Sequence, residues 1–153
     1  MSHRESIERL VYESGSTLDA LDFKGYLELC EDGYEYSIEA YSPEIRKDMV
    51  WLHHDKAGMD TLFKNLPKHN SDHSTLMRHL TVYKVDVDEA SGEANVISGL
   101  QVFRTELDGG TTELFAIAKQ HDTIKLNDGY PKLSKRTIRL ETRNLGIGHH
   151  VPF

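Results

Sequence analysis

Four long stretches between Leu76 and Leu145 constrain the fold more than any other feature of this chain. They read as strands because β-branched and other apolar residues dominate them and turn sequences separate them. No helical stretch of adequate length joins them, so parallel crossovers are excluded and the strands form an antiparallel meander. Strands this long must twist, which favours a strongly bent sheet wrapped around helices. The predicted strands are Leu76–Val87, Ala94–Leu107, Thr112–Leu126 and Leu133–Leu145.

The first part of the chain has a helical pattern instead. A first helix is predicted from an apolar stripe at helical spacing, and a second helix is predicted to begin after a cap at Asp22 and to end at Asp32-Gly33. A strand from Tyr34 to Tyr41 follows, and Ser42-Pro43 ends it. A further helix is predicted from Asp55 to Leu66, where Pro67 stops it. The stripes are Ile7, Leu10, Val11, Ser14, Leu18 and Leu21 in the first helix, and Phe23, Tyr26, Leu27 and Cys30 in the second.

Together these patterns predict one α+β domain spanning residues 1–153, with N-terminal helices packed on the bent antiparallel sheet. Charged residues at 28% and a net charge of -7 indicate a soluble, acidic surface, which argues against nucleic acid as a partner. No apolar run approaches the roughly 18 residues of a membrane span. The N-terminus lacks a signal-peptide core, and Cys30 is the only cysteine, so no internal disulfide forms. We therefore expect a cytoplasmic protein.

Both faces of the predicted sheet carry apolar side chains, whereas a sheet with one wet face should alternate cleanly. The helices cover one face only, so the other face is predicted to be a subunit interface. The alternative is that bends in the strands swap the faces midway and place both sets in one core. The opposed sets are Met77, Tyr83, Val85 and Val87 against Leu76, Leu80 and Val82, then Ala94, Val96, Leu100 and Val102 against Ile97, Phe103 and Leu107, then Phe115 and Ile117 against Leu114, Ala116, Ala118, Ile124 and Leu126.

Nine histidines raise the question of a metal site. His53-His54-Asp55 has the ligand types of a non-haem iron site, but adjacent side chains point apart, and Asp55 fits better as a helix cap. The stretch His69–His73 reads as a solvated loop, and His149-His150 as a surface tail. A single cysteine excludes Cys-rich zinc and four-ligand iron–sulfur sites. We expect no metal ligand in this chain.

His79 is the one candidate for acid–base chemistry. On a concave sheet it could face an interior pocket with Tyr34, Tyr36 or Tyr83, although a satisfied core or interface histidine explains it better because no carboxylate partner can be named. The sequence lacks a G-x-S-x-G elbow, a phosphate loop and a dinucleotide fingerprint. We therefore expect no catalytic or cofactor-binding residue. The basic stretch Lys132, Lys135, Arg136, Arg139 and Arg143 is interpreted as a solvated edge or a surface for an anionic partner.

Several short sequence segments, occurring in a fixed order, connect the chain to a known family. They are Ile7–Glu13, Leu18-Asp19, Phe23–Asp32, Tyr34-Glu-Tyr36, Arg78-His79, Phe103-Arg104 and Lys135–Leu140 after an Asp-Gly turn. In combination the chain resembles, over nearly its whole length, the small (beta) subunit of Rieske-type ring-hydroxylating oxygenases. The tail Gly146–Phe153 and the segment Val50–His54 depart from the family pattern, which leaves their roles unassigned.

The resemblance implies a cone-shaped fold of the cystatin-like, nuclear-transport-factor-like kind. It also implies a large (alpha) oxygenase subunit as partner, which would carry the Rieske [2Fe-2S] cluster and the mononuclear iron, and self-association as a trimer. The small subunit would hold the assembly together and contribute no iron ligand. The sequence agrees with the absence of a cluster from this chain, because a Rieske centre needs two cysteines and two histidines and Cys30 is the only cysteine.

Two functions of different classes follow. The first is a non-catalytic structural subunit of the hydroxylase component of a monooxygenase or dioxygenase. The second is a stand-alone cone-fold isomerase or dehydratase with His79 as its acid or base and Tyr34 or Tyr36 beside it. Fold analogy alone cannot choose between them.

Overall fold

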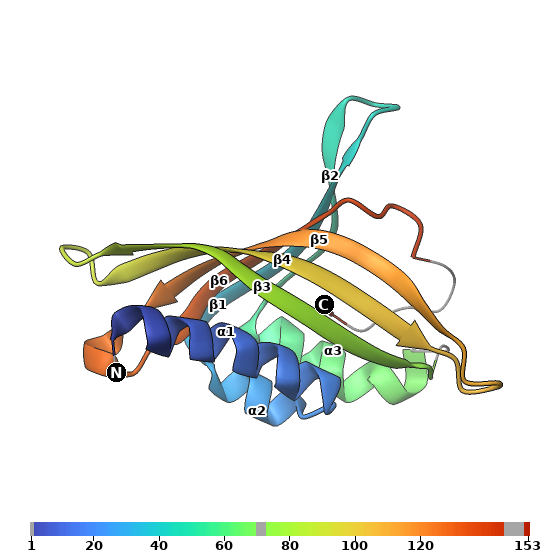
Figure 1. Ribbon diagram of the computed structural model, residues 1–153, viewed down its shortest axis with the longest axis horizontal. Coiled ribbons are helices and arrows are strands. Elements are labelled where there is room, and N and C mark those ends of the chain that lie inside the picture. The colour runs from blue at the N-terminus through green and yellow to red at the C-terminus, as the bar shows by residue number, and fades with distance from the viewer. Residues whose placement is uncertain (1, 70–72, 146–151) are drawn as a thin grey trace.

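Three helices lie against one face of a twisted six-stranded sheet, and one hairpin projects from the opposite side (Figure 1). The structure is a computed structural model that describes residues 2–69, 73–145 and 152–153. The predicted α+β fold with a bent sheet is confirmed. No helix in those ranges is long and apolar enough to span a membrane. The elements are α1 (His3–Asp19), α2 (Phe23–Glu28), β1 (Cys30–Ser42), β2 (Lys47–Asp55), α3 (Lys56–His69), β3 (Thr75–Asp88), β4 (Glu93–Thr105), β5 (Thr112–Lys125), the 3-10 turn η1 (Asn127–Gly129) and β6 (Lys132–Leu140).

The two N-terminal helices begin at side-chain caps. Ser2 and Glu5 form a capping box at α1, and Asp22 accepts the Gly25 N–H at 2.9 Å, as the sequence predicted for the second helix. The predicted stripe of α1 is buried from Ile7 to Leu18. Leu21 was wrongly included in it, because the helix has already ended and this residue is exposed with a φ of 56°.

The sheet has the strand order β2-β1-β6-β5-β4-β3. The four predicted long strands form an antiparallel meander from β3 to β6, although β6 ends at Leu140 rather than Leu145. The expectation of a purely antiparallel sheet is wrong at one pair, because β1 runs parallel to β6. In the sequence β2, α3 and the strands β3 to β5 lie between these two neighbours, and α3 connects the β2 edge of the sheet to the β3 edge.

Two further boundaries differ from the sequence prediction, and one strand is missing from it. Asp32-Gly33 does not separate a helix from a strand, because β1 already begins at Cys30 and absorbs these residues where its pairing with β6 is irregular. Pro67 does not stop α3, which continues through the proline to His69. The sequence does not predict the strand β2, because its first five side chains are all exposed and burial alternates only from Leu52 onward.

Bulges resolve much of the apparent two-faced character of the sheet. Tyr83 is an extra residue in β3, which turns Val85 and Val87 to the side of Leu80, where they pack against the core. Phe115 is a similar extra residue in β5 and also packs against the core. The predicted face swap therefore accounts for these three side chains. Met77, Leu114 and Ile117 stay on the outer face and remain exposed, as does Tyr83 itself.

Candidate functional site

An ion pair fills the centre of the cone between the sheet and the helices. Arg136 of β6 and Asp122 of β5 form a two-point contact, with Nε–Oδ1 at 2.7 Å and Nη2–Oδ2 at 3.1 Å. The same Nη2 donates to the Ser14 hydroxyl of α1 at 2.8 Å, and Gln120 donates to Asp122 at 3.0 Å. All four residues are at most 2% exposed. The polar interior is therefore a closed network that ties the sheet to the first helix.

Burial disfavours the charged guanidinium of Arg136, but the carboxylate of Asp122, together with Tyr26 and Tyr34, more than offsets this cost and holds the pKa of Arg136 well above its ordinary value. Arg136 also lies over the Tyr26 ring, at 5.9 Å from its centroid. The cation stays charged within the core because its counter-ion and a hydroxyl acceptor are built in beside it.

Three buried tyrosines surround this pair. The Tyr26 and Tyr34 hydroxyls are hydrogen-bonded to each other, and the Tyr36 hydroxyl accepts the Phe153 N–H at 2.9 Å. Burial raises the pKa of each of these phenols, so they are protonated at neutral pH. Burial likewise raises the pKa of the Cys30 thiol to about 12, which leaves it a packing residue rather than a nucleophile.

Arg78 links the end of α1 to the last residues of the chain at the inner face of the sheet. Its guanidinium pairs with Asp19 at 2.8 Å and donates to the Pro152 carbonyl at 2.6 Å. The Phe153 ring is 1% exposed and contacts Phe115, with the ring centroids 6.4 Å apart. Of the unassigned tail Gly146–Phe153, the described end is thus part of the core.

The structure does not bring the alternative catalytic residues together. His79 is on the outer face of β3, exposed, with its ring 5.0 Å from that of Phe103. Tyr34 and Tyr36 are fully buried among the side chains of the inner face. Because neighbouring residues of a strand point to opposite faces, buried Arg78 and exposed His79 mark the two sides of the same strand. His79 borders a shallow hollow of about 290 Å³ with Tyr83, Gln101 and Ile117 among its lining residues.

The other histidine candidates are dispersed. His53 and His54 lie at the end of β2, just before α3, and Asp55 accepts the Gly58 N–H at 2.7 Å. The predicted capping role of Asp55 is therefore confirmed. His149 and His150 lie outside the described residues, as do residues 70–72 of the predicted loop. In the described part of the chain, no three His, Cys, Asp or Glu side chains gather in a group that could hold a metal ion.

The basic stretch of β6 is not a solvated edge, because β6 lies in the middle of the sheet between β1 and β5. Arg136 is the buried cation of the interior. Arg139 instead reaches Glu39 at 2.8 Å and Asp48 at 3.0 Å, and Arg143 reaches Glu44 at 3.2 Å. These two arginines brace the strands of the projecting hairpin.

The projecting hairpin is the feature that sequence reasoning missed. We call residues 41–51 the arm, which comprises the end of β1, the turn and most of β2 (Figure 1). Its large apolar side chains are exposed, and the register places Met49 on the opposite face from Tyr41 and Val50. The exposed fractions are 50% for Tyr41, 58% for Ile45, 44% for Met49, 60% for Val50 and 42% for Trp51. The run Met49-Val-Trp51 was the signal available in the sequence.

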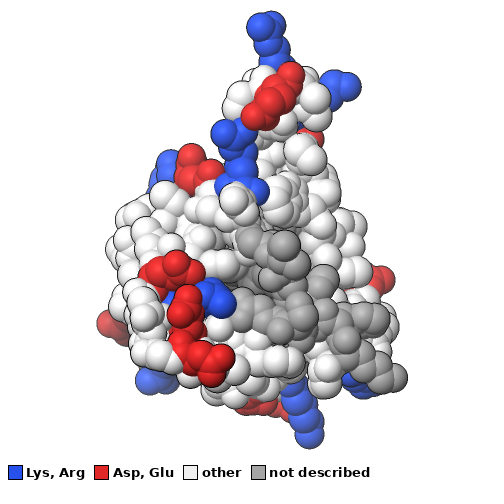
Figure 2. Space-filling view, turned by 90° about the vertical axis from the view of Figure 1, so that its right-hand side faces the viewer, with Lys and Arg blue, Asp and Glu red and all other residues white. Residues whose placement is uncertain are grey.

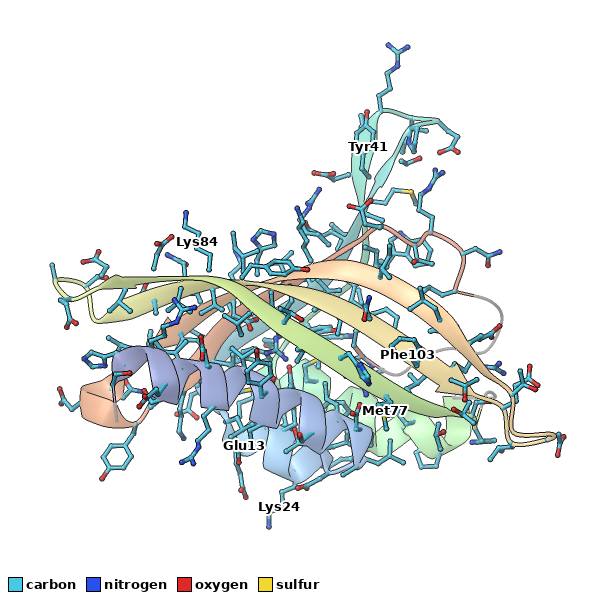
Figure 3. The ribbon with its side chains drawn as sticks, in the orientation of Figure 1. Glu13, Lys24, Tyr41, Met77, Lys84 and Phe103 are labelled. Atoms are coloured by element: carbon cyan, nitrogen blue, oxygen red, sulfur yellow. The ribbon has the colours of Figure 1, made fainter. Side chains whose placement is uncertain are left out.

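A second exposed apolar surface lies on the outer face near the β4–β5 turn. The register sets Met77, Phe103 and Leu114 in one row across β3, β4 and β5. Met77 is 57% exposed, Leu114 is 53% exposed, and Leu107 in the turn is 66% exposed. We call these four residues the row. Figure 3 shows Met77 and Phe103 far from Tyr41 of the arm.

Comparison with known structures identifies the fold. A chain described as the beta subunit of a putative aromatic-ring-hydroxylating dioxygenase from Novosphingobium aromaticivorans superposes with a TM-score of 0.80, covering 97% of this chain and 95% of that one at 19% identity. An NTF2-like protein with a cystatin-like fold from the same organism gives a TM-score of 0.66 at 17% identity, covering 92% and 83% of the two chains. The molecule is therefore a cystatin-like cone.

Sequence comparison identifies the family. The sequence model described as "Ring hydroxylating beta subunit" matches residues 14–146. The hydroxylase beta subunit of methanesulfonate monooxygenase from Methylosulfonomonas methylovora is 37% identical, covering 97% of this chain and 86% of that one. The beta subunit of 2-aminobenzenesulfonate 2,3-dioxygenase from Alcaligenes sp is 29% identical, covering 96% and 97%. The chain belongs to the family of ring-hydroxylating oxygenase beta subunits, as its resemblance indicated.

Proposed function

We propose that this chain is the non-catalytic, structural small subunit of a Rieske non-haem iron oxygenase. It binds a large subunit and stabilises the hetero-oligomer. One contrast carries the proposal: the cone interior is filled by a closed network around Arg136 and Asp122, whereas large apolar side chains are displayed outside on the arm. The buried tyrosine hydroxyls already have hydrogen-bond partners within the chain, and displayed apolar side chains favour contacts with other chains.

The iron centres are proposed to lie in the large subunit. A Rieske cluster takes two cysteine and two histidine ligands, and Cys30 is the only cysteine of this sequence and is buried. The small subunit then contributes surface for contacts between subunits rather than ligands to iron. It is also proposed to associate with its own copies as a trimer, since closed rings are a usual way to satisfy an exposed surface on a repeated subunit.

The oxygenase is proposed to act on an organic sulfonate. The two relatives described above are named for methanesulfonate and for 2-aminobenzenesulfonate, which differ in the carbon skeleton and share the sulfonate group. Substrate selection would then be a property of the large subunit.

Co-purification tests this function. The untagged chain is produced with a tagged large oxygenase subunit, and the captured material is analysed for mass, subunit ratio and iron. We expect equimolar subunits, with iron in the complex and none in the small subunit purified alone. The proposal fails if the chain is not captured, or if the separate chain converts either sulfonate without the large subunit.

A further inference from the structure

The tip of the arm carries positive charge that the chain itself does not neutralise. Glu44 and Asp48 are each paired with an arginine near β6, which leaves Arg46 and Lys47. Neither of these two makes an ion pair within the described ranges. Arg46 also adopts a φ of 54°, a left-handed conformation that costs a non-glycine residue about 1 kcal/mol. The tip therefore presents two cations beside the apolar Ile45.

The opposite combination lies at the far end of the sheet. Glu106, Asp108 and Glu113 surround the β4–β5 turn, where Arg104 is the one cation that contacts them in the described structure, at 3.6 Å from Glu106 and 3.2 Å from Glu113. The local charge is negative, and the row lies beside it. Figure 2 shows a mainly acidic group with basic atoms among it on the body of the molecule, and basic side chains beside acidic ones on the projection, with basic side chains outermost.

These two surfaces are complementary in polarity and in charge, and they lie on different parts of one chain. The arm is apolar on both faces with a basic tip, and the row is apolar with an acidic rim. The arm projects away from the helices (Figure 3), and the row lies on the outer face of the sheet. A contact between two different surfaces of identical chains is head-to-tail, and it closes into a ring when the rotation permits.

We propose that the arm of one copy of this chain docks on the row of a second copy, with Arg46 and Lys47 facing Glu106, Asp108 and Glu113. This assignment rests on the self-association included in the proposed function and specifies its surfaces. Each copy gives its arm to one neighbour and receives the arm of another. Apolar burial holds the contact, and the charges fix its orientation.

Two variants with one broken surface each test the assignment. Val50→Glu/Ile45→Asp disables the arm, and Leu107→Asp/Leu114→Glu disables the row. All four side chains are more than half exposed, so neither variant removes core packing. Leu21→Glu/Tyr130→Glu is the matched control, because those side chains are 64% and 79% exposed and belong to neither surface. Mass is measured by light scattering at about 50 µM chain, together with capture by a tagged large subunit.

We expect the wild type and the control to form the closed oligomer and each broken variant to be a monomer. An equimolar mixture of the two broken variants should form a heterodimer, because one intact arm still meets one intact row. The reversal Arg46→Glu/Lys47→Glu should weaken self-association at least tenfold, and adding Glu106→Lys/Asp108→Lys/Glu113→Lys to the same chain should restore it.

The outcomes separate this assignment from the function on which it rests. If the arm variant still forms the same oligomer as the wild type, the arm-on-row contact is overturned and the subunit role stays intact. The same holds if the mixture of the two broken variants stays monomeric. A symmetric contact between two β2 edges would instead leave the row variant oligomeric by itself, which also overturns the arm-on-row contact. A wild-type monomer overturns self-association as a whole. An arm variant that keeps its oligomer and loses the large subunit assigns the arm to that partner and overturns the present inference.

Discussion

The cone interior and the arm both contain ion pairs between an arginine of β6 and a carboxylate of another strand, but one pair is buried and the other is exposed to water. The cost of breaking the pair therefore differs between the two regions. Arg136 and Asp122 are shielded from water, each is the counter-ion of the other, and Ser14 and Gln120 add hydrogen bonds to them. Arg139 pairs with Glu39 and Asp48 at the surface, where 39% of its side chain is exposed. Losing one partner in the interior leaves an unpaired buried charge, whereas losing one on the arm leaves a hydrated one.

The difference separates stability from assembly. The buried network fixes how helix and sheet pack, so changes there should act on folding. The arm holds exposed apolar side chains on a braced hairpin, so changes there should act on association and leave folding nearly untouched. Four measurements sharpen or break this division.

The largest effect is expected in the interior. Asp122→Asn leaves the Arg136 guanidinium buried without its counter-ion, so the free energy of unfolding should fall by about 3–5 kcal/mol. Urea denaturation followed by circular dichroism measures this loss. The double variant Asp122→Leu/Arg136→Met removes both charges and should recover much of the stability. A loss below about 1 kcal/mol in the single variant would show that water reaches the pair.

The buried tyrosines predict unfolding in alkali. Each of Tyr26, Tyr34 and Tyr36 has a pKa in the folded chain above the value of about 10 in the unfolded chain. Their contribution to stability is therefore complete below pH 10 or so and is lost as pH rises beyond it, because the unfolded state releases protons first. Absorbance at 295 nm and circular dichroism should change together for these three phenols. Ionisation of all seven tyrosines before the fold is lost would contradict their burial.

A smaller effect is expected where the end of the chain joins the core. Tyr36→Phe removes the hydroxyl that accepts the Phe153 N–H, at a cost of about 1 kcal/mol. Thermal unfolding of this variant measures the loss, with Tyr41→Phe as the exposed control. Equal melting temperatures for Tyr36→Phe and the wild type would show that the contact with Phe153 does not form in solution.

The smallest effect is expected on the arm. Arg139→Gln should lower the free energy of unfolding by about 0.5 kcal/mol, because solvent screens its pairs with Glu39 and Asp48. Arg143→Gln should leave the urea midpoint unchanged, since its partner Glu44 is hydrated. Destabilisation by either variant as large as that of Asp122→Asn would remove the distinction between the two regions.

The sequence predicted the parts of the fold that repeat a simple pattern. The stripe from Ile7 to Leu18, the cap at Asp22 and the β3–β6 meander each follow from local spacing and turn chemistry. The parallel pairing of β1 with β6 joins residues about a hundred positions apart, which no local pattern encodes. The swap of faces at Tyr83 and Phe115 was foreseen as an alternative, but its positions depend on bulges that a period-two pattern does not locate.

The candidate site was harder to predict for the same reason. Arg136 looked like one member of a solvated basic strand, because its partner Asp122 lies on the neighbouring strand and only the register brings them together. His79 was singled out as a lone histidine beside Arg78, yet strand alternation places it outside and Arg78 inside. The arm has no burial pattern to detect, since its apolar residues lie on both faces of a hairpin that leaves the body.

The most direct test of the non-catalytic role is the rate of sulfonate conversion per iron in the assembled oxygenase. The complex is prepared with the wild-type small subunit and with His79→Ala/Tyr34→Phe, which removes the polar groups that a cone-fold enzyme would use. The account predicts that complexes of equal mass and iron content convert substrate at equal rates. A loss of about a hundredfold or more with assembly and iron unchanged, the contribution expected of a general acid or base, would contradict it.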